Sequence, residues 1–165
     1  MFITGYGVES TSHKHGLFQD ICLAYELILP NGEWIRCTKD ENPELFYAVP
    51  WSYGTLGFLV AAELQIIPAK KYVHVKYEPF TQREAALKRF EAVSREAKDE
   101  FVECLQYSKT DFVLMIGNFA DSAENVPVNP IGNFYKPWFF SHVQTYLEKN
   151  KPGEELIPLR DYYHR

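Results

Sequence analysis

The chain has 165 residues, with 22 acidic and 17 basic side chains, so its formal net charge at pH 7 is −5. Hydrophobic residues make up 46% and charged residues 24%, the balance of a globular chain and not of a disordered one. No excess of Lys and Arg is available to neutralise phosphates, so we expect no nucleic-acid partner. No apolar run reaches the roughly 18 residues of a transmembrane helix, and no signal peptide is recognisable.

Cysteines and aromatic residues set two further expectations. Cys22, Cys37 and Cys104 form no Cys-x-x-Cys pair, so the sequence predicts neither a metal site nor a disulfide framework. Aromatic residues make up 16% of the chain. This content favours either a large core, which is the commoner explanation, or a site for a flat apolar ligand.

The segment from Phe2 to Gly16 begins like a strand and continues as a glycine-containing loop. The hydroxyls of residues 10–12 compete with the backbone for hydrogen bonds, so no helix is predicted here. The segment suits either a surface turn or a loop that holds a phosphate or polyol through backbone N–H groups and hydroxyls. It lacks the Gly-Lys-Ser/Thr of a Walker A loop, and Ser10 stands where a Rossmann fingerprint needs its third glycine.

A β-hairpin is predicted next. Apolar residues recur at every second position from Ile21 to Leu29, and Asn31-Gly32 is a strong signal for a hairpin turn before a return strand over 33–38. A short helix should follow, capped by Asn42, started by Pro43 and stopped by Pro50. Its buried stripe is expected to be Leu45, Phe46 and Val49.

A third strand is predicted over 55–67, apolar on both faces in its first half and alternating in its second. Gly57 inside this strand indicates the close approach of a ligand or of another backbone. Pro68 closes the strand, and Lys70-Lys71 is expected to be a hinge into a second unit.

The second unit is predicted to have the order β-α-β-β, which is typical of an α+β fold. A strand over 72–77 precedes a helix with a Thr81-x-x-Glu84 capping box. The buried face of this helix should carry Ala86, Phe90, Val93 and Ala97. Strands at 101–107 and 112–119 and a helix opened by Pro137 follow, and no element is predicted in the tail from Glu154 to Arg165.

Four stretches of this sequence resemble the Δ24-sterol reductases, also called 24-dehydrocholesterol reductases. The first two are Thr4 to Phe18, with its Gly-Tyr-Gly-Val-Glu-Ser-Thr-Ser-His-Lys-His-Gly run, and Leu45 to Glu63, with Val-Pro-Trp-Ser-Tyr-Gly-Thr-Leu-Gly-Phe. The others are Gly132 to Phe140 and Ile157 to Arg165. Together they extend over nearly the whole chain. These reductases belong to the flavoproteins with a vanillyl-alcohol-oxidase or PCMH-type FAD-binding domain.

The resemblance implies an α+β architecture in two parts. Residues 1–69 resemble the second subdomain of a PCMH-type FAD-binding domain, and residues 70–165 resemble the beginning of a substrate cap. The chain is therefore expected to be an internal fragment that lacks the main pyrophosphate loop, the membrane-anchoring segment and the rest of the cap. The resemblance also implies the cytoplasmic face of the endoplasmic reticulum membrane as the location of the full-length protein.

The activity implied by the resemblance is reduction of the C24=C25 double bond of a desmosterol-like sterol. NADPH would be the hydride donor and FAD the cofactor. As acids that protonate the second carbon, Tyr135, Tyr162, Tyr163, His142 and His164 are chemically possible, and none is assigned. The residues implied in FAD binding are Thr4, Gly5, Tyr6, Gly7, Val8, Glu9, Ser10, Thr11, Ser12, His13, Lys14, His15 and Gly16.

Several alternatives stay open. The chain could instead come from a sugar- or lactone-type oxidase of the same flavoprotein group, or from a non-catalytic scaffold without flavin. His13, Lys14 and His15 either place positive charge near the FAD phosphates or lie on a solvated loop. Trp51 and Trp138 are expected to be core anchors, with a stacking platform for a ligand as the less common alternative.

Overall fold

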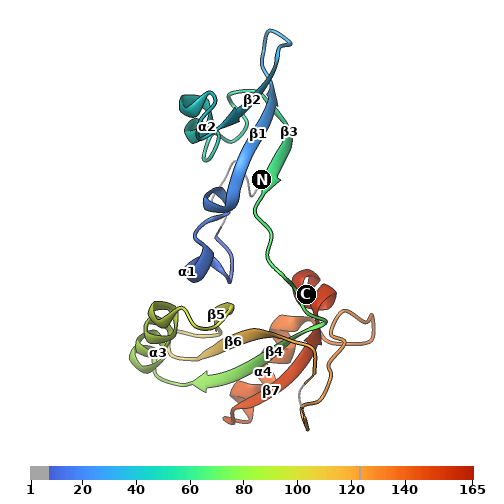
Figure 1. The fold of residues 1–165 in the computed structure, drawn as a ribbon. Coiled ribbons are helices and arrows are strands. Elements are labelled where there is room, and N and C mark those ends of the chain that lie inside the picture. The colour runs from blue at the N-terminus through green and yellow to red at the C-terminus, as the bar shows by residue number, and fades with distance from the viewer. Residues whose placement is uncertain (1–7, 123) are drawn as a thin grey trace. The chain divides into compact units, whose positions relative to one another are not determined.

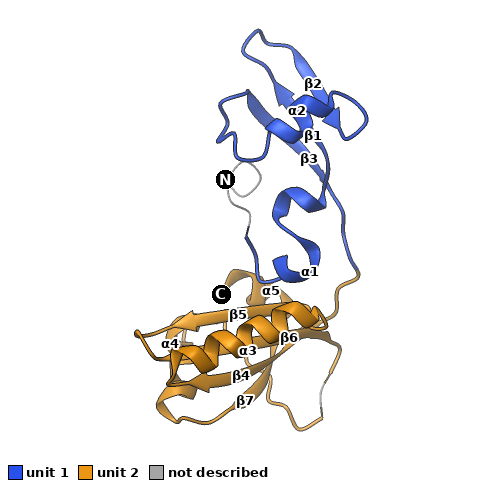
Figure 2. Ribbon diagram, turned by 90° about the vertical axis from the view of Figure 1, so that its left-hand side faces the viewer, with its two compact units in different colours: residues 1–67 blue, residues 68–165 orange. Residues whose placement is uncertain are grey.

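A computed structural model describes residues 8–122 and 124–165 of the chain. It divides into two compact units, Met1–Ile67 and Pro68–Arg165, drawn in different colours in Figure 2. This division lies two residues before the boundary expected between residues 69 and 70. The assignment of the two units to an FAD-binding subdomain and a substrate cap stays a prediction.

Unit 1 is built on an antiparallel sheet with the strand order β2-β1-β3 (Figure 1). The strands are β1 (Cys22–Ile28), β2 (Trp34–Thr38) and β3 (Phe58–Leu64). The predicted hairpin is confirmed: Gly32 has φ +84°, and the N–H of Leu29 donates to the carbonyl of Glu33 at 2.8 Å. The positive φ explains why the turn needs its glycine.

Helix α2 (Pro43–Ala48) covers this sheet and begins at the predicted proline. Phe46 and Val49 are buried, as expected, and join Cys22, Tyr25, Leu27 and Cys37 in the core of unit 1. The prediction that the Asn42 side chain caps this helix is wrong. Asn42 has a left-handed conformation, and its side-chain amide donates to the carbonyl of Arg36 at 2.9 Å instead of capping the helix.

Two other expectations for unit 1 are also wrong. A single helical turn, α1 (Ser12–His15), lies in the segment for which no helix was predicted, and the 3-10 helix η1 (Phe18–Ile21) follows that segment. Backbone bonds from Lys14 and His15 to the carbonyl of Thr11 close the turn, so the hydroxyls do not outcompete the backbone here. Strand β3 begins only at Phe58, which is 82% exposed, so the first half of that strand is not buried on both faces.

Unit 2 contains a four-stranded antiparallel sheet with the order β5-β6-β4-β7 (Figure 1). Its strands are β4 (Tyr72–Phe80), β5 (Phe101–Gln106), β6 (Phe112–Ala120) and β7 (Gly153–Pro158). The predicted β-α-β-β order is present, and the α+β fold class is confirmed. Strand β7 and the following helix α5 (Leu159–His164) lie in the tail, where no element was predicted.

Helices pack on both faces of this sheet. On one face, Val93 of α3 (Arg83–Glu96) packs with Val102, Leu114 and Ile116. On the other face, α4 (Phe139–Glu148) and α5 cover a larger core. Strand residues alternate between the two faces, which is why neighbouring positions of β6 serve different cores. The larger core contains Val73, Val75, Tyr77, Phe101, Val113, Met115, Ile131, Val143, Ile157 and Tyr162.

Two details of unit 2 differ from expectation. The capping box is absent: helix α3 has Gln82 at its N-cap, in an extended conformation and without a side-chain cap bond. Trp138 is not a core anchor, because it is 86% exposed, and in unit 1 Trp51 is 42% exposed. In unit 2 the neighbouring Phe139 packs against the core instead of Trp138.

Candidate functional site

The loop predicted to bind the cofactor is described from Val8 to Gly16. Thr4, Gly5, Tyr6 and Gly7 lie outside the described residues. The backbone N–H of Glu9 donates to Oγ of Ser12 at 2.8 Å, and that of Ser12 donates back to the carbonyl of Glu9 at 3.0 Å. These bonds and the α1 turn engage much of the backbone within the loop, so a ligand would meet mainly side chains here. The assignment of these residues to a cofactor stays a prediction.

Gly16 closes this loop. Its φ is +81°, and a Cβ at this position would lie 2.4 Å from a carboxylate oxygen of Asp20. The same Asp20 carboxylate accepts a hydrogen bond of 2.7 Å from the N–H of Leu17. Both the positive φ and the close carboxylate require glycine, so the structure gives this residue a local structural role.

A surface pocket of about 460 Å³ lies beside the hairpin turn of unit 1. Gly57 borders it, and a Cβ on Gly57 would lie 2.6 Å from the carbonyl oxygen of Ile28. The glycine predicted to face either a ligand or a backbone therefore faces the backbone of β1. None of the described residues that line the pocket carries a charge, and they are Ile28, Leu29, Pro30, Gly32, Gly54, Thr55, Gly57 and Phe58.

The turn that leads into this pocket has an unusual backbone. Trp51 and Tyr53 have φ values of +67° and +51°, in the left-handed region that side chains with a Cβ rarely adopt. The turn is fixed by two bonds from Thr55, whose Oγ1 and N–H donate to the carbonyl of Ser52 at 2.7 and 3.0 Å. Such strain costs of order 1–3 kcal/mol per residue and is common at ligand sites. Among the described segments, it makes this turn a candidate for function.

Helix α1 and the hairpin turn after Ile28 lie at opposite ends of β1 (Figure 1), and the pocket is lined by residues of that turn. Helix α1 and η1 precede the strand, and the pocket follows its last residue, Ile28. With a rise of about 3.4 Å per residue, a seven-residue strand separates them by roughly 20–25 Å. The two features therefore do not form one compact site, and only an extended ligand would contact both.

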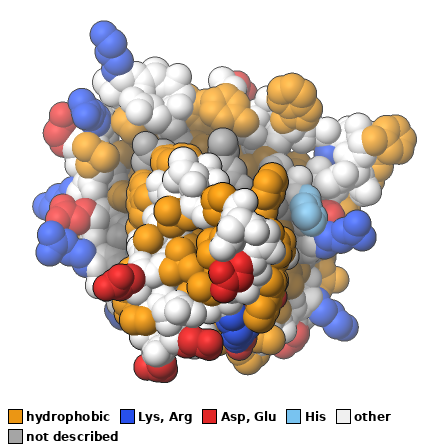
Figure 3. Space-filling model, turned by 90° about the horizontal axis from the view of Figure 1, so that it is seen from above, with side chains coloured by type: hydrophobic (Ala, Val, Ile, Leu, Met, Phe, Trp, Pro, Cys, Tyr) orange, Lys and Arg blue, Asp and Glu red, His pale blue; other side chains and the backbone are white. Residues whose placement is uncertain are grey.

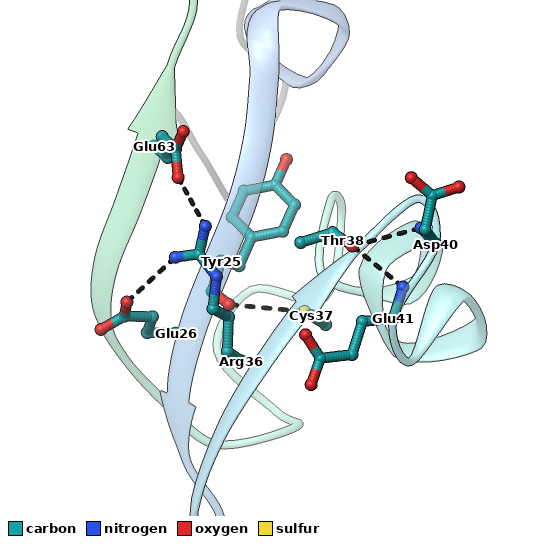
Figure 4. Close-up of polar contacts among 8 residues, drawn as sticks. All are labelled: Tyr25, Glu26, Arg36, Cys37, Thr38, Asp40, Glu41 and Glu63. Carbon is teal, nitrogen blue, oxygen red and sulfur yellow. Dashed lines mark hydrogen bonds and ion pairs between the residues drawn. The ribbon is translucent and has the colours of Figure 1, made fainter.

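Arg36 ties the three strands of unit 1 together (Figure 4). Its guanidinium donates to Glu26 of β1 at 3.1 Å and to Glu63 of β3 at 2.5 Å. The bond to Glu63, and then that to Glu26, raises the pKa of Arg36. The arrangement occupies both carboxylates, which makes it a strand clamp and not a free acid–base pair.

Hydrophobic side chains are exposed on the face of the molecule drawn in Figure 3.

Unit 2 contains a buried polar cluster that was not predicted. Glu155 is only 4% exposed, and its Oε1 accepts a 2.6 Å bond from the hydroxyl of Tyr77. Nε2 of His142 lies 2.8 Å from the same oxygen, and the amide of Asn129 donates to Oε2 at 3.0 Å. Strands β4 and β7, helix α4 and the segment before it each supply one member. A buried carboxylate with three polar partners is well satisfied, and it fixes the position of all three.

Two tyrosines beside this carboxylate are kept neutral. Burial, followed by the charge of Glu155 and the bond to it, raises the pKa of Tyr77 far above its ordinary value. Burial and then Glu155 raise the pKa of Tyr146 to about 12. The two rings stack with centroids 4.2 Å apart, and a Cβ on Gly153 would lie 2.4 Å from the Tyr146 ring. The glycine therefore makes room for the stacked ring.

The five chemically possible acids lie in different surroundings within unit 2. Tyr162 is buried and donates to Glu103 at 2.7 Å, while His142 contacts Glu155. Tyr135 is 66% exposed, and its hydroxyl accepts from the amide of Asn133 at 3.0 Å. Tyr163 and His164 are exposed. The rings of Tyr162 and Tyr163 meet edge to face, with centroids 6.0 Å apart.

Sequence reasoning missed Glu155 because no strand was predicted in the tail. One signal was present: in the run Glu154 to Ile157, alternation places Glu155 on the same face as the apolar Ile157. An acid on the inward face of a strand needs polar partners, which would have directed attention to Tyr77 and Asn129.

Residues 8–122 and 124–165, which the structure describes, contain neither a candidate metal site nor a membrane-spanning helix. No group of three or more His, Cys, Asp or Glu side chains in these ranges is placed to hold a metal ion. No helix in them is long and apolar enough to cross a membrane. The three cysteines are free thiols, and burial raises the pKa of each.

Comparisons with known proteins connect the chain to sterol reductases. It is 58% identical over 163 residues to human Delta(24)-sterol reductase, covering 99% of this chain and 32% of that protein. It is 43% identical over 175 residues to the Arabidopsis thaliana Delta(24)-sterol reductase, covering 99% and 31%. A shorter match, 37% over 67 residues, joins 41% of this chain to 13% of a D-arabinono-1,4-lactone oxidase of Yarrowia lipolytica. No family model matches the chain.

Two solved structures share its fold. Chitooligosaccharide oxidase matches with a TM-score of 0.58 and 15% identity, over 95% of this chain and 32% of that one. The carbohydrate oxidase from Microdochium nivale matches with a TM-score of 0.55 and 19% identity, again over 95% and 32%. At these identities the likeness concerns the fold alone. By sequence, this chain belongs with the Delta(24)-sterol reductases, and it spans about one third of the length of those that it matches.

Proposed function

We propose that the protein to which this chain contributes reduces the C24=C25 double bond of a sterol side chain, with FAD as cofactor and NADPH as hydride donor. The observation that carries this proposal is the identity of 57–58% to mammalian Delta(24)-sterol reductases over 99% of the chain. A desmosterol-like sterol is the proposed substrate. The fold shared with carbohydrate oxidases is consistent with a redox enzyme.

The side chains of unit 1 suit an extended dinucleotide. The loop of residues 8–16 carries hydroxyls at Ser10, Thr11 and Ser12, next to His13, Lys14 and His15. Hydroxyl and cationic groups are appropriate partners for a pyrophosphate. The uncharged pocket beside Gly57, at the other end of β1, suits a flat ring. FAD, when bound, would supply the hydride chemistry, and this chain would hold and orient it.

Reduction of the double bond needs a hydride on one carbon and a proton on the other. We assign no acid in this chain, because Tyr162 and His142 are already engaged with Glu103 and Glu155. We propose that unit 2 contributes shape and exclusion of water at the substrate. We further propose that the full-length protein acts at the cytoplasmic face of the endoplasmic reticulum membrane, a location that rests on the family resemblance.

A chimera tests the activity directly. The matching third of human Delta(24)-sterol reductase is replaced by this chain, and NADPH-dependent conversion of desmosterol is measured in cells that lack the reductase. We expect bound flavin and turnover within about tenfold of the human protein. A chimera that folds and binds flavin but does not reduce desmosterol would contradict the proposal.

The cofactor loop is tested in the same chimera by two matched lysine variants. Lys14→Ala removes a cation from the proposed pyrophosphate loop, whereas Lys39→Ala removes an exposed cation after β2. A lost charge-assisted bond of about 1.5–3 kcal/mol should weaken FAD binding at least roughly tenfold in the first variant only. Equal flavin affinity in both variants would exclude Lys14 from the site.

An oxidase acting on a lactone is the second candidate. The 37% identity over 67 residues to a D-arabinono-1,4-lactone oxidase supports it, although this match covers only 41% of the chain. Oxygen consumption by the chimera with an aldonolactone, without desmosterol reduction, would favour this candidate. Absence of flavin in a folded chimera would instead favour a non-catalytic scaffold.

A further inference from the structure

An exposed aromatic segment lies between β6 and α4. We call residues 133–138 the aromatic loop. Phe134 is 99% exposed, Trp138 86% and Tyr135 66%. No acidic residue occurs between Glu124 and Glu148, and the loop itself carries one cation, Lys136. Large rings so fully exposed, in a stretch without acids, suggest a partner that covers them.

The loop has a defined shape. The N–H of Asn133 donates to the carbonyl of Pro130 at 3.1 Å, and that of Lys136 donates to the carbonyl of Asn133 at 2.9 Å. The amide of Asn133 also donates to the Tyr135 hydroxyl at 3.0 Å, and the rings of Phe134 and Tyr135 meet edge to face, 5.5 Å apart. Two turns thus present the rings in a fixed arrangement.

Both ends of the loop are anchored in the core of unit 2. Ile131 is 6% exposed and belongs to the buried cluster, and Phe139 packs against that cluster. The Arg165 guanidinium lies 4.6 Å from the centroid of the Phe139 ring. The anchors hold the backbone while Phe134 and Trp138 extend into solvent. Ile131 and Phe139 therefore pack in the core, whereas Phe134 and Trp138 do not.

We propose that the aromatic loop is a membrane contact, with Phe134 and Trp138 entering the boundary between lipid headgroups and acyl chains. Trp and Tyr rings, each apolar with one polar atom, are favoured at this depth, and Phe adds apolar area. Lys136 has no ion-pair partner among the described residues and suits an anionic headgroup. The proposal concerns where unit 2 meets lipid, and it does not depend on the reductase activity.

A lipid surface fits better than a second copy of the chain. A symmetric contact between two copies of the loop would bring Lys136 close to its own counterpart. Residues 125–147 contain no Asp or Glu that could neutralise the two cations. A bilayer interface instead accepts rings and a single cation together. Burial of one large ring typically strengthens such an association about tenfold or more.

Trp138 itself reports on the contact. The chain has three tryptophans, so Trp34→Phe with Trp51→Phe leaves Trp138 as the one tryptophan. This variant is mixed with vesicles of phosphatidylcholine, alone or with phosphatidylserine, and with vesicles whose acyl chains are brominated. We expect the Trp138 emission to shift to the blue and to be quenched by the brominated lipids. Binding to the vesicles with phosphatidylserine should be about fivefold tighter than to phosphatidylcholine alone, and Lys136→Ala should remove this difference.

Matched variants distinguish insertion of the aromatic loop into lipid from non-specific adsorption of exposed hydrophobic side chains. Phe134→Ser with Trp138→Ser, in the otherwise unaltered chain, should reduce vesicle co-flotation at least about tenfold. Phe58→Ser, which removes a ring that is 82% exposed in unit 1, should leave co-flotation unchanged. Equal loss in both, or flotation without quenching of Trp138, would overturn the proposal. So would a dimer in lipid-free solution that the loop variants dissociate.

The longer protein supplies the last test. In the chimera with human Delta(24)-sterol reductase, a photoreactive phenylalanine analogue is placed at the position of Phe134 and irradiated in microsomes. We expect adducts with lipid. Adducts within the polypeptide or with another protein would show that a protein surface covers the loop, and would overturn the membrane assignment.

Discussion

Tyr77 and Glu155 are 78 residues apart in the sequence, yet the tyrosine hydroxyl donates a 2.6 Å hydrogen bond to the carboxylate in the interior of unit 2. The contact joins two adjacent strands, β4 and β7, and His142 adds helix α4 to the same oxygen. Because Glu155 is almost fully buried, its partners determine the cost of losing its charge.

Glu155→Gln should lower the free energy of unfolding by about 2–3 kcal/mol. The amide places an N–H donor opposite either Asn129 or the Tyr77 hydroxyl, which are themselves donors. The neighbouring Glu154→Gln is the control, because Glu154 is exposed and pairs with His74, and we expect a cost below about 1 kcal/mol. Denaturant unfolding of both variants measures the difference. Equal costs would show that burial of Glu155 has no energetic importance.

Gly57→Ala should destabilise unit 1 by about 1–3 kcal/mol. Its Cβ would lie 2.6 Å from the Ile28 carbonyl, so the end of the hairpin must shift. Gly54→Asn is the matched control: Gly54 has φ +80° with open space around it, and Asn tolerates that conformation. We expect the control to cost only a few tenths of a kcal/mol. If it costs as much as Gly57→Ala in chemical denaturation, the close approach to Ile28 is not the cause.

Gly153 and Tyr146 should be strongly coupled. Gly153→Ala is expected to cost about 1–3 kcal/mol, because the new Cβ meets the Tyr146 ring. In a Tyr146→Ala background that obstacle is gone, and the same glycine substitution should cost close to nothing. A double-mutant cycle of unfolding free energies should therefore give a coupling of about 1 kcal/mol or more. Additive costs would contradict the contact.

Stability should fall at alkaline pH. The pKa of Tyr146 is raised from 10.0 to about 12 in the folded chain. Below pH 10 the tyrosine is protonated in both folded and unfolded states and contributes no pH dependence. Between about pH 10 and 12 the unfolded state loses its proton first, so stability decreases as pH rises.

The melting temperature measured between pH 8 and 12 checks this window. Tyr146→Phe should make the alkaline decline shallower, while Tyr77, whose pKa is also raised, continues to contribute. Tyr47→Phe changes a tyrosine that is 66% exposed on α2 and should leave the decline as it is. An unchanged slope in the Tyr146 variant would mean that Tyr146 does not titrate differently in the two states.

The sequence alone determined the features that depend on neighbours in the chain. Asn31-Gly32 predicted the hairpin because its turn needs a positive φ, which Gly32 has. The spacing of Ala86, Phe90 and Val93 predicted the buried face of α3 because a helix repeats every 3.6 residues. The fourth predicted member, Ala97, is instead the C-cap residue, with a left-handed backbone. The motifs at residues 4–18 and 45–63 identified the family, since they carry resemblance independently of any structure.

Only the tertiary structure decided which of these residues meet across the fold. It placed Glu155 beside Tyr77 and His142. This contact depends on strand pairing and helix packing between segments that are distant in the sequence. It also gave the core position to Phe139 and left Trp138 exposed, although both are large and apolar. Composition cannot distinguish two adjacent rings, because the direction in which a backbone turns decides which one reaches the core.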